Sequence, residues 1–444
     1  MKPKNPILIL LAAGLWLTAV HAQEVECFRW DAKINGQPVR LILDTGCNAP
    51  VVLLRPAAER LGLKLKSQLQ PAGETSPAVW LTADCTTDLP DWAYWGFWSH
   101  TLHLRMPLAV SDSPAWVGHE IPFDGFVGWP LVCRHITQLD ATKRKFRFLK
   151  RLPKEATGWT KLPVRTVTPK PDEVLFEIPS PNGSKTAVGL STLELELPNP
   201  DGSKGVILVD TGGLGGGVDL APLEWRAWKA AHTNAPTWLL AEWREEDAGI
   251  TVQERGWAAQ FLLGPLKLTD VPVEEEAVLP FLDLAAKDYV ARLGFEALKR
   301  LDCILDGQHG LAYLRPKTTS SPPLIFGQCH VAFAPRGTNA VNLVATVIEG
   351  SAAFKAGIRS GDVLVKIDHQ EVAQWRMHPG ENWSTKPHPG FVWVPATNSA
   401  AGTKLALSLK RGDRTFDATV ARRGIAIVAP PPQTNSPPSH SKGL

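Results

Sequence analysis

The chain has 444 residues, of which 44% are apolar, and it carries a formal net charge of +3. This length is enough for about three domains with sizeable hydrophobic cores. The near balance of acidic and basic residues lacks the basic surplus that is typical of nucleic-acid-binding proteins, so we expect no nucleic-acid partner.

Residues 1–22 have the features of a secretory signal peptide. Lys2 and Lys4 form a basic start, an apolar stretch follows over 6–20, and Ala22 is a small residue at the expected cleavage position. The alternative is an uncleaved anchor, but the apolar stretch is shorter than the roughly 20 residues of a membrane-spanning helix. We therefore predict a periplasmic or secreted protein without a stable membrane anchor.

Six cysteines are present in this chain, and they leave the disulfide pairing open. Their spacing lacks the close Cys and His pairs of a structural zinc site, so we predict no metal site. The glycine-rich run 212–217 does not fit the spacing of a phosphate-binding loop, and we expect no cofactor.

Short β-rich segments with one intervening helix dominate the first part of the chain. Apolar patterns predict strands at 39–43, 101–110 and 146–149, and a helix at 56–63. The same order follows later, with strands at 206–209, 258–268 and 311–314 and a helix at 221–231. Both parts are therefore predicted to be mostly β with one or two short helices.

Several motifs of the first part recur 166 residues later. Asp44-Thr45-Gly46 and Asp210-Thr211-Gly212 each follow an apolar run and are 210 − 44 = 166 residues apart. The turn dipeptides Asn35-Gly36 and Asp201-Gly202 keep this offset, as do Gly128 and Gly294. The chain therefore contains an internal duplication of one structural unit, and two such units can build a site with one carboxylate from each.

Asp44 and Asp210 are the predicted catalytic pair. Two carboxylates held close together cannot both ionise, so they share a proton, and one can take a proton from water while the other donates one to a carbonyl oxygen. Gly46 and Gly212 would allow each loop to turn sharply. The hydroxyls of the two threonines, Thr45 and Thr211, would bond to the opposing loop.

These residues resemble the aspartic proteases of the pepsin and retropepsin clan. The apolar-Asp-Thr-Gly signature is present twice, and segment 124–131, which contains Gly128, looks like the element that crosses behind the catalytic loop in that clan. Its counterpart at 289–298, which contains Gly294, departs from the pattern with Arg292 at an apolar position. The resemblance covers about residues 28–316 and implies a mainly β, bilobal fold with a cleft between two duplicated lobes.

A second departure concerns the residue after each Asp-Thr-Gly motif. Many pepsins have Ser or Thr there, which bonds to the carboxylate, whereas this chain has Cys47 and Gly213. Because neither residue donates strongly, we expect a pH optimum less acidic than that of relatives with hydroxyls. Segments 72–80 and 238–253 are candidate lids over the cleft, in which Trp80 and Trp243 are substrate-cleft candidates or ordinary rim and core aromatics.

A third domain follows the duplicated part. Segment 344–368, with Gly-Ser-Ala-Ala, Ala-Gly and Gly-Asp-Val-Leu elements, resembles a bacterial-type PDZ domain over about 328–423. That resemblance implies binding of an extended or C-terminal peptide by strand addition. The alternative is a PDZ fold used only as a structural appendage, and an insertion is predicted at 374–401.

The sequence therefore predicts an exported aspartic endopeptidase that acts on polypeptides, with a PDZ domain for substrate binding or regulation. The alternative is a non-catalytic peptide-binding protein that retains the bilobal cleft. The predicted organisation is a signal peptide (1–22), lobe 1 (23–155), lobe 2 (156–316), a linker (317–327), a PDZ domain (328–423) and a disordered tail (424–444).

Overall fold

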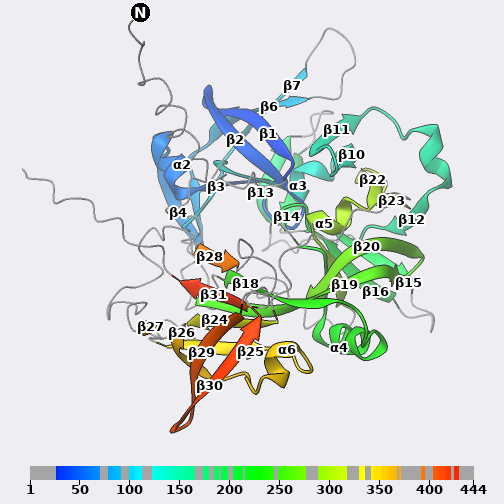
Figure 1. Ribbon diagram of the computed structural model, residues 1–444. Coiled ribbons are helices and arrows are strands. Elements are labelled where there is room, and N and C mark those ends of the chain that lie inside the picture. The colour runs from blue at the N-terminus through cyan, green and yellow to red at the C-terminus, as the bar shows by residue number, and fades with distance from the viewer. Residues whose placement is uncertain are drawn as a thin grey trace, which may run out of the picture.

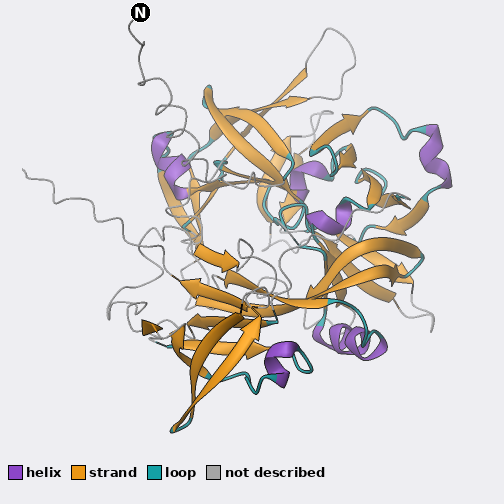
Figure 2. Cartoon of the chain, viewed as in Figure 1, coloured by secondary structure: helices purple, strands orange, loops and turns teal. Residues whose placement is uncertain are grey.

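The structure is a computed structural model, and it is mainly β (Figure 2). It describes residues 27–70, 79–91, 100–112, 123–165, 174–179, 185–189, 192–198, 204–213, 216–244, 249–276, 289–317, 330–335, 342–367, 370–371, 392–395, 404–421 and 425–429. The predicted signal peptide and most of the predicted linker lie outside these residues. Within these ranges, none of the helices is long and apolar enough to cross a bilayer.

A nine-stranded sheet forms the first unit, in the order β4-β5-β8-β3-β9-β2-β1-β6-β7 (Figure 1). The turn between its first two strands is Asn35-Gly36, where both residues have positive φ, as a tight hairpin requires. Its elements are β1 (Arg29–Ile34), β2 (Gln37–Asp44), β3 (Val51–Leu54), α2 (Arg55–Arg60), β4 (Leu65–Gln70), β5 (Val79–Thr82), β6 (Cys85–Asp91), β7 (His100–Met106), β8 (Ala109–Ser111), β9 (Gly125–Gly128) and α3 (Trp129–Val132).

A seven-stranded sheet forms the second unit, in the order β15-β16-β21-β17-β20-β19-β18. Here β16 pairs in parallel with β21, which pairs antiparallel with β17, and β17 pairs in parallel with β20. In the first sheet β2, β9, β3 and β8 are paired in the same way. The elements are β15 (Glu194–Pro198), β16 (Lys204–Val209), β17 (Val218–Leu220), α4 (Pro222–Ala231), β18 (Thr237–Arg244), β19 (Gly249–Leu263), β20 (Leu266–Glu275), β21 (Tyr289–Leu293) and α5 (Phe295–Leu298).

A five-stranded sheet joins the two units, in the order β11-β10-β22-β23-β12. One continuous hydrophobic core extends through both units, and the rings of Phe28 and Phe295 lie 5.1 Å apart within it. The joining elements are β10 (Ile136–Asp140), β11 (Lys145–Leu149), the 3-10 helix η3 (Lys154–Gly158), β12 (Thr160–Pro163), β22 (Leu301–Asp306) and β23 (Leu311–Pro316), and β13 (Val174–Pro179) and β14 (Lys185–Gly189) form a separate hairpin.

The C-terminal unit has its own sheet and its own hydrophobic core. It packs against the second sheet through a small apolar cluster in which Leu239 and Val252 meet Ala332 and Ile348. Its elements are β24 (Val331–Pro335), β25 (Leu343–Val347), α6 (Ala352–Lys355), β26 (Val363–Ile367), β27 (Gln370–Glu371), β28 (Val392–Pro395), β29 (Lys404–Arg411), β30 (Arg414–Ala421) and β31 (Ile425–Ala429).

The predicted strands and helices are present, with three differences. Segment 101–110 is two strands, β7 and β8, because Pro107 between them has no N–H to donate to a ladder. Segment 258–268 is likewise divided by a turn at Gly264, which has positive φ. The prediction of disorder is wrong for residues 425–429, which form β31 and pair with β24 and β28. Cys47, Cys85, Cys133 and Cys303 are free thiols.

Candidate active site

Asp44 and Asp210 occupy matching places in the two units. Asp44 is the last residue of β2, and Asp210 directly follows β16, so each carboxylate stands where a central strand ends. Asp44 Oδ1 accepts hydrogen bonds from the backbone N–H of Gly46 (2.9 Å) and Cys47 (3.0 Å). Asp210 Oδ1 accepts one from the N–H of Gly212 (2.9 Å). Each loop therefore orients its own carboxylate with backbone donors.

The two threonines join the loops by a reciprocal set of hydrogen bonds. The N–H of Thr45 donates to Thr211 Oγ1 (2.9 Å), and the N–H of Thr211 donates to Thr45 Oγ1 (3.1 Å). In turn, Thr45 Oγ1 donates to the carbonyl of Val209 and Thr211 Oγ1 to that of Leu43 (2.5 and 2.7 Å). Both threonines are fully buried. The predicted bond from each hydroxyl to the opposing loop is therefore present on both sides.

The carboxyl groups of Asp44 and Asp210 face each other across the paired loops. A Cβ built on Gly46 would lie 2.8 Å from Asp210 Cγ, and one built on Gly212 would lie 2.3 Å from Asp44 Cγ. Only glycine at these two positions allows both carboxyl groups to fit. Burial raises the pKa of Asp44 well above its usual range, and the charge of Asp210 and a hydrogen bond with it act in the same direction.

Gly128 and Gly294 lie directly behind the two loops. A Cβ on Gly128 would be 2.0 Å from the carbonyl oxygen of Ala49, and a Cβ on Gly294 would be 2.5 Å from that of Gly216. The backbone N–H that follows each glycine bonds to its loop, from Trp129 to Cys47 and from Phe295 to Gly213. These two glycines therefore allow β9 and β21 to pass close behind the carboxylates.

Arg292, which departs from the apolar pattern, contacts Asp210 from behind. Its Nη1 lies 3.4 Å from Asp210 Oδ2, and its Nε and Nη2 bond to Asp219 Oδ2 (2.9 and 2.8 Å). Nε is also 2.9 Å from Glu276 Oε2. Asp219 and Glu276 are both buried, and Tyr289 lies close enough for their charges to act on its hydroxyl. Burial by itself lowers the pKa of Arg292, but the charges of Asp219, Glu276 and Asp210 outweigh it and raise that pKa.

The network around Arg292 was not predicted from the sequence. Asp219 stands between Val218 and Leu220 in a short apolar strand, and its register partner on β21 is Arg292. An acidic residue in one apolar strand and a basic residue in another is the signal that would have found it. Charges on buried strands are rare unless they are paired.

The residues after the two Asp-Thr-Gly motifs differ in what they offer. The thiol of Cys47 donates to the carbonyl of Ala49 (3.6 Å), while its N–H serves Asp44. Burial and the neighbouring charge of Asp44 raise the pKa of this thiol. A Cβ on Gly213 would lie 3.0 Å from Asp210 Oδ2, so this position faces the carboxylate without providing a side-chain donor.

Trp80 lies on β5, opposite Gln68 of β4. Its indole N–H donates to Asp112 Oδ2 (2.7 Å), and Asp112 also pairs with Arg55, whose guanidinium lies over the indole ring. The tip of this hairpin and most of the predicted lid 72–80 lie outside the described residues. Trp243 is on β18, opposite Ile250 of β19, in the corresponding hairpin of the second sheet, and its side chain lies outside the described part.

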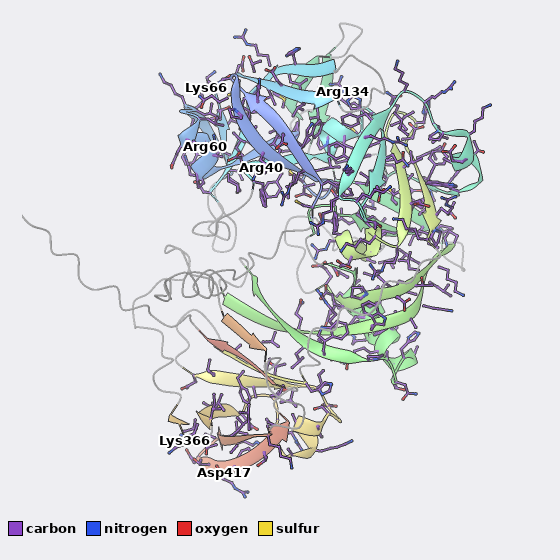
Figure 3. The ribbon with its side chains drawn as sticks, turned by 45° about the horizontal axis from the view of Figure 1, so that its top comes forward. Arg40, Arg60, Lys66, Arg134, Lys366 and Asp417 are labelled. Carbon is purple, nitrogen blue, oxygen red and sulfur yellow. The ribbon has the colours of Figure 1, made fainter. Side chains whose placement is uncertain are left out.

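The entry to β9 is held by a second set of contacts, away from the carboxylates. Asp124 Oδ2 accepts from the N–H of Arg40 (2.8 Å), and Asp124 Oδ1 pairs with Arg60 Nη2 (2.8 Å). Figure 3 labels Arg40 and Arg60 on the first unit, and Lys366 and Asp417 on the C-terminal unit at the other end of the molecule.

A family model matches the first of the two loops. Residues 30–83, which include Asp44-Thr45-Gly46, match the model of a family described as aspartyl protease. No curated protein matches the chain. Similar solved structures include the EIAV protease in complex with the inhibitor HBY-793, at 20% identity, covering 24% of this chain and 86% of that one with a TM-score of 0.16.

The aspartic proteinase from Irpex lacteus is a second similar structure, at 13% identity, covering 67% of this chain and 96% of that one with a TM-score of 0.35. The family match supports a hydrolase of the aspartic protease class.

Proposed function

We propose that this protein is an exported aspartic endopeptidase in which Asp44 and Asp210 activate water for peptide-bond hydrolysis. One observation carries the proposal. Two Asp-Thr-Gly loops, joined by reciprocal threonine hydrogen bonds, bring two carboxyl groups face to face. The fold that supports it is pepsin-like, with two duplicated β lobes over 23–155 and 156–316. The matching strand pairings on either side of the site support the duplication.

In the proposed reaction the ionised carboxylate takes a proton from water, and the water oxygen attacks the scissile carbonyl carbon. The protonated carboxyl gives its proton to the carbonyl oxygen, which yields a tetrahedral gem-diol. As this collapses, the first carboxyl passes its proton to the departing amine nitrogen, and the second takes a proton back from a hydroxyl. The pair ends with one shared proton, as it began, and the products are an acid and an amine.

We also propose that the C-terminal unit, over 328–423, is a PDZ domain. Its Ser351 hydroxyl caps α6 by accepting from the N–H of Phe354 (3.2 Å), and Asp362 accepts from the N–H of Arg359. These bonds involve the Gly-Ser-Ala-Ala and Gly-Asp-Val-Leu elements. In the described sheet β24 is an interior strand, bordered by β25 and β31, and β28 and β30 end the order. A peptide added next to β24 would therefore have to displace β25 or β31.

The proposal is tested with the mature protein, a denatured polypeptide substrate and a series of buffers from acidic to neutral pH. We expect cleavage by the wild type and a loss of about 100-fold or more in Asp44→Asn and Asp210→Asn variants. Asp31→Asn, at an exposed aspartate on β1, is the matched control and should retain activity. Binding of the polypeptide without cleavage at any pH would instead identify a peptide-binding protein.

Export is proposed from residues 1–22 alone. Expression of the full chain in a bacterium, followed by fractionation and N-terminal sequencing, is the direct measurement. A periplasmic or secreted product that begins at Gln23 is expected. A product that stays in the cytoplasm with Met1 still attached would contradict the proposal.

A further inference from the structure

Behind the two facing carboxylates, the environments of the two units differ in charge. Behind Asp44 stands Phe126 of β9, which packs with Ile42, Leu54 and Phe123 in a purely apolar cluster with Cys27. Behind Asp210 stands Arg292 of β21 at the corresponding position, 166 residues later (292 − 126). In the described part of the chain, no lysine or arginine lies within ion-pairing distance of Asp44.

The guanidinium of Arg292 is held in one orientation. Asp219 on β17 accepts from Nε and contacts Nη2, and Oε2 of Glu276, which follows β20, lies 2.9 Å from Nε as an ion-pair contact. Nη1 is therefore the nitrogen directed toward Asp210 Oδ2, at 3.4 Å. In the second sheet β17 lies between β21 and β20. A planar guanidinium fixed on two sides presents its remaining N–H groups at a defined place.

We propose that Arg292 is a positioning residue that places the negative charge of the catalytic pair on Asp210 and the shared proton on Asp44. This inference rests on the proposed dyad. In the reaction, Asp210 would then accept the proton of the attacking water, and Asp44 would donate to the scissile carbonyl oxygen. The two aspartates would have different roles although their loops share one backbone design.

The physical reason is the direct contact between a cation and one of two otherwise similar carboxylates. An opposite charge within about 4–6 Å favours the ionised form of a carboxyl group. Asp44 accepts hydrogen bonds from two backbone N–H groups, and its burial, the charge of Asp210 and a hydrogen bond with Asp210 raise its pKa, which favours the protonated form there. Gly213 gives the second loop no hydroxyl donor of its own, and Arg292 donates to Asp210 from behind.

Other charges around Arg292 determine how the test must be designed. Asp219 and Glu276 face the guanidinium together with Asp210, and the hydroxyl of Tyr289 lies near all of them. Removing Arg292 alone would leave two buried acids without their cation, and these would themselves disfavour an ionised Asp210. A variant that also neutralises both acids is therefore needed to isolate the contact with Asp210.

The first measurement is the pH dependence of kcat/KM on a denatured polypeptide, whose acidic limb reports the carboxylate that must be ionised in the free enzyme. Arg292→Met should move this limb upward by about one to three pH units. The triple variant Asp219→Asn, Glu276→Gln, Arg292→Met should also move it upward, by about one unit. The double variant Arg255→Met, Glu274→Gln is the control, since it removes a buried ion pair of the same sheet without leaving an uncovered acid, and it should leave the limb unchanged.

A triple variant with the wild-type acidic limb would overturn the inference, because the shift in Arg292→Met would then come from the uncovered acids. If Arg292→Met fails to fold, as judged by circular dichroism, the triple variant still decides, because it removes the charges of Asp219 and Glu276 together with their cation. A wild type without cleavage at any pH, beside an active Arg292→Met, would mean that Arg292 blocks turnover.

A second measurement does not require activity and separates this inference from the proposed function. In an Asp44→Asn background, the carboxyl carbon of ¹³C-labelled Asp210, assigned by its loss in Asp210→Asn, is titrated by NMR. With Arg292 present Asp210 should ionise at lower pH than in the triple variant. If Asp210 titrates equally with Arg292 present and in the triple variant, the inference is wrong even when the wild type is an active protease. A difference would support the inference even without cleavage.

Discussion

The two Asp-Thr-Gly loops have similar backbones, but the side chains packed behind them differ. Behind Asp44, Phe126 belongs to an apolar cluster, whereas behind Asp210, Arg292 belongs to a buried network with Asp219 and Glu276. The hydrogen bonds between the loops are nearly symmetric, since each threonine serves the other. The shared backbone therefore sets where the carboxylates stand, and the differing side chains behind them provide a means to make the two unequal.

The largest effect on stability is expected at the glycines behind the loops, where the two units should behave alike. Gly128→Ala would place a Cβ 2.0 Å from a backbone carbonyl oxygen, and Gly294→Ala would place one at 2.5 Å. Neither oxygen can move without shifting a loop. Each substitution should lower the free energy of unfolding by about 3 kcal/mol or more. Thermal denaturation checks this against Gly158→Ala, where the added Cβ meets nothing within 4 Å.

The threonines give the next largest effect and test the symmetry of the loops most directly. Thr45→Val or Thr211→Val removes a hydroxyl that both donates and accepts, and each leaves a buried backbone N–H and a buried carbonyl unpaired. Each should cost about 1–3 kcal/mol, by urea denaturation, with similar values for the two. Thr157→Val, at an exposed hydroxyl, should be near neutral. A clearly unequal loss of unfolding free energy in the two variants would show that the loops are not symmetric.

The pH dependence of the stability should show the raised pKa of Asp44. The folded-state pKa of Asp44 is raised, so its contribution to stability is fully present below the usual carboxyl pKa and is lost as pH rises through the raised value. Asp44→Asn places a neutral group there without the uptake of a proton, and should therefore increase Tm at neutral pH but not at low pH. Calorimetric scans at both pH values check this. A variant that is less stable than the wild type at neutral pH would contradict the assignment.

The smallest effect is expected at two equivalent turns on the joining sheet. Lys143 pairs with Asp140 (3.2 Å) and His309 pairs with Asp306 (2.8 Å), again at the 166-residue offset. Both the lysine and the histidine are largely exposed, so Lys143→Ala and His309→Ala should each change the free energy of unfolding by no more than about 0.5 kcal/mol. A loss of several times that in one of them would show that the two turns are not equivalent.

Sequence patterns predicted the local strands and turns that carry the site, but not the side-chain contacts between segments that are distant in the chain. The apolar segment 39–43 and the Asn35-Gly36 dipeptide predicted β2 and the turn before it, because both signals are local. The Arg292 network was missed because Asp210, Asp219, Glu276 and Arg292 come from four chain segments that meet only in the sheet. Strand β31 was missed since its pairing partners, β24 and β28, are distant in the chain.

By itself, the sequence determined that two Asp-Thr-Gly turns end two apolar strands and that a crossing glycine follows each at the same distance. These features depend on nearest neighbours and on a repeat that can be counted. Tertiary structure alone decided that Arg292 contacts Asp210, whereas within the described residues no lysine or arginine contacts Asp44. The strength of a buried charge depends on which groups surround it in space, and a linear pattern does not contain that information.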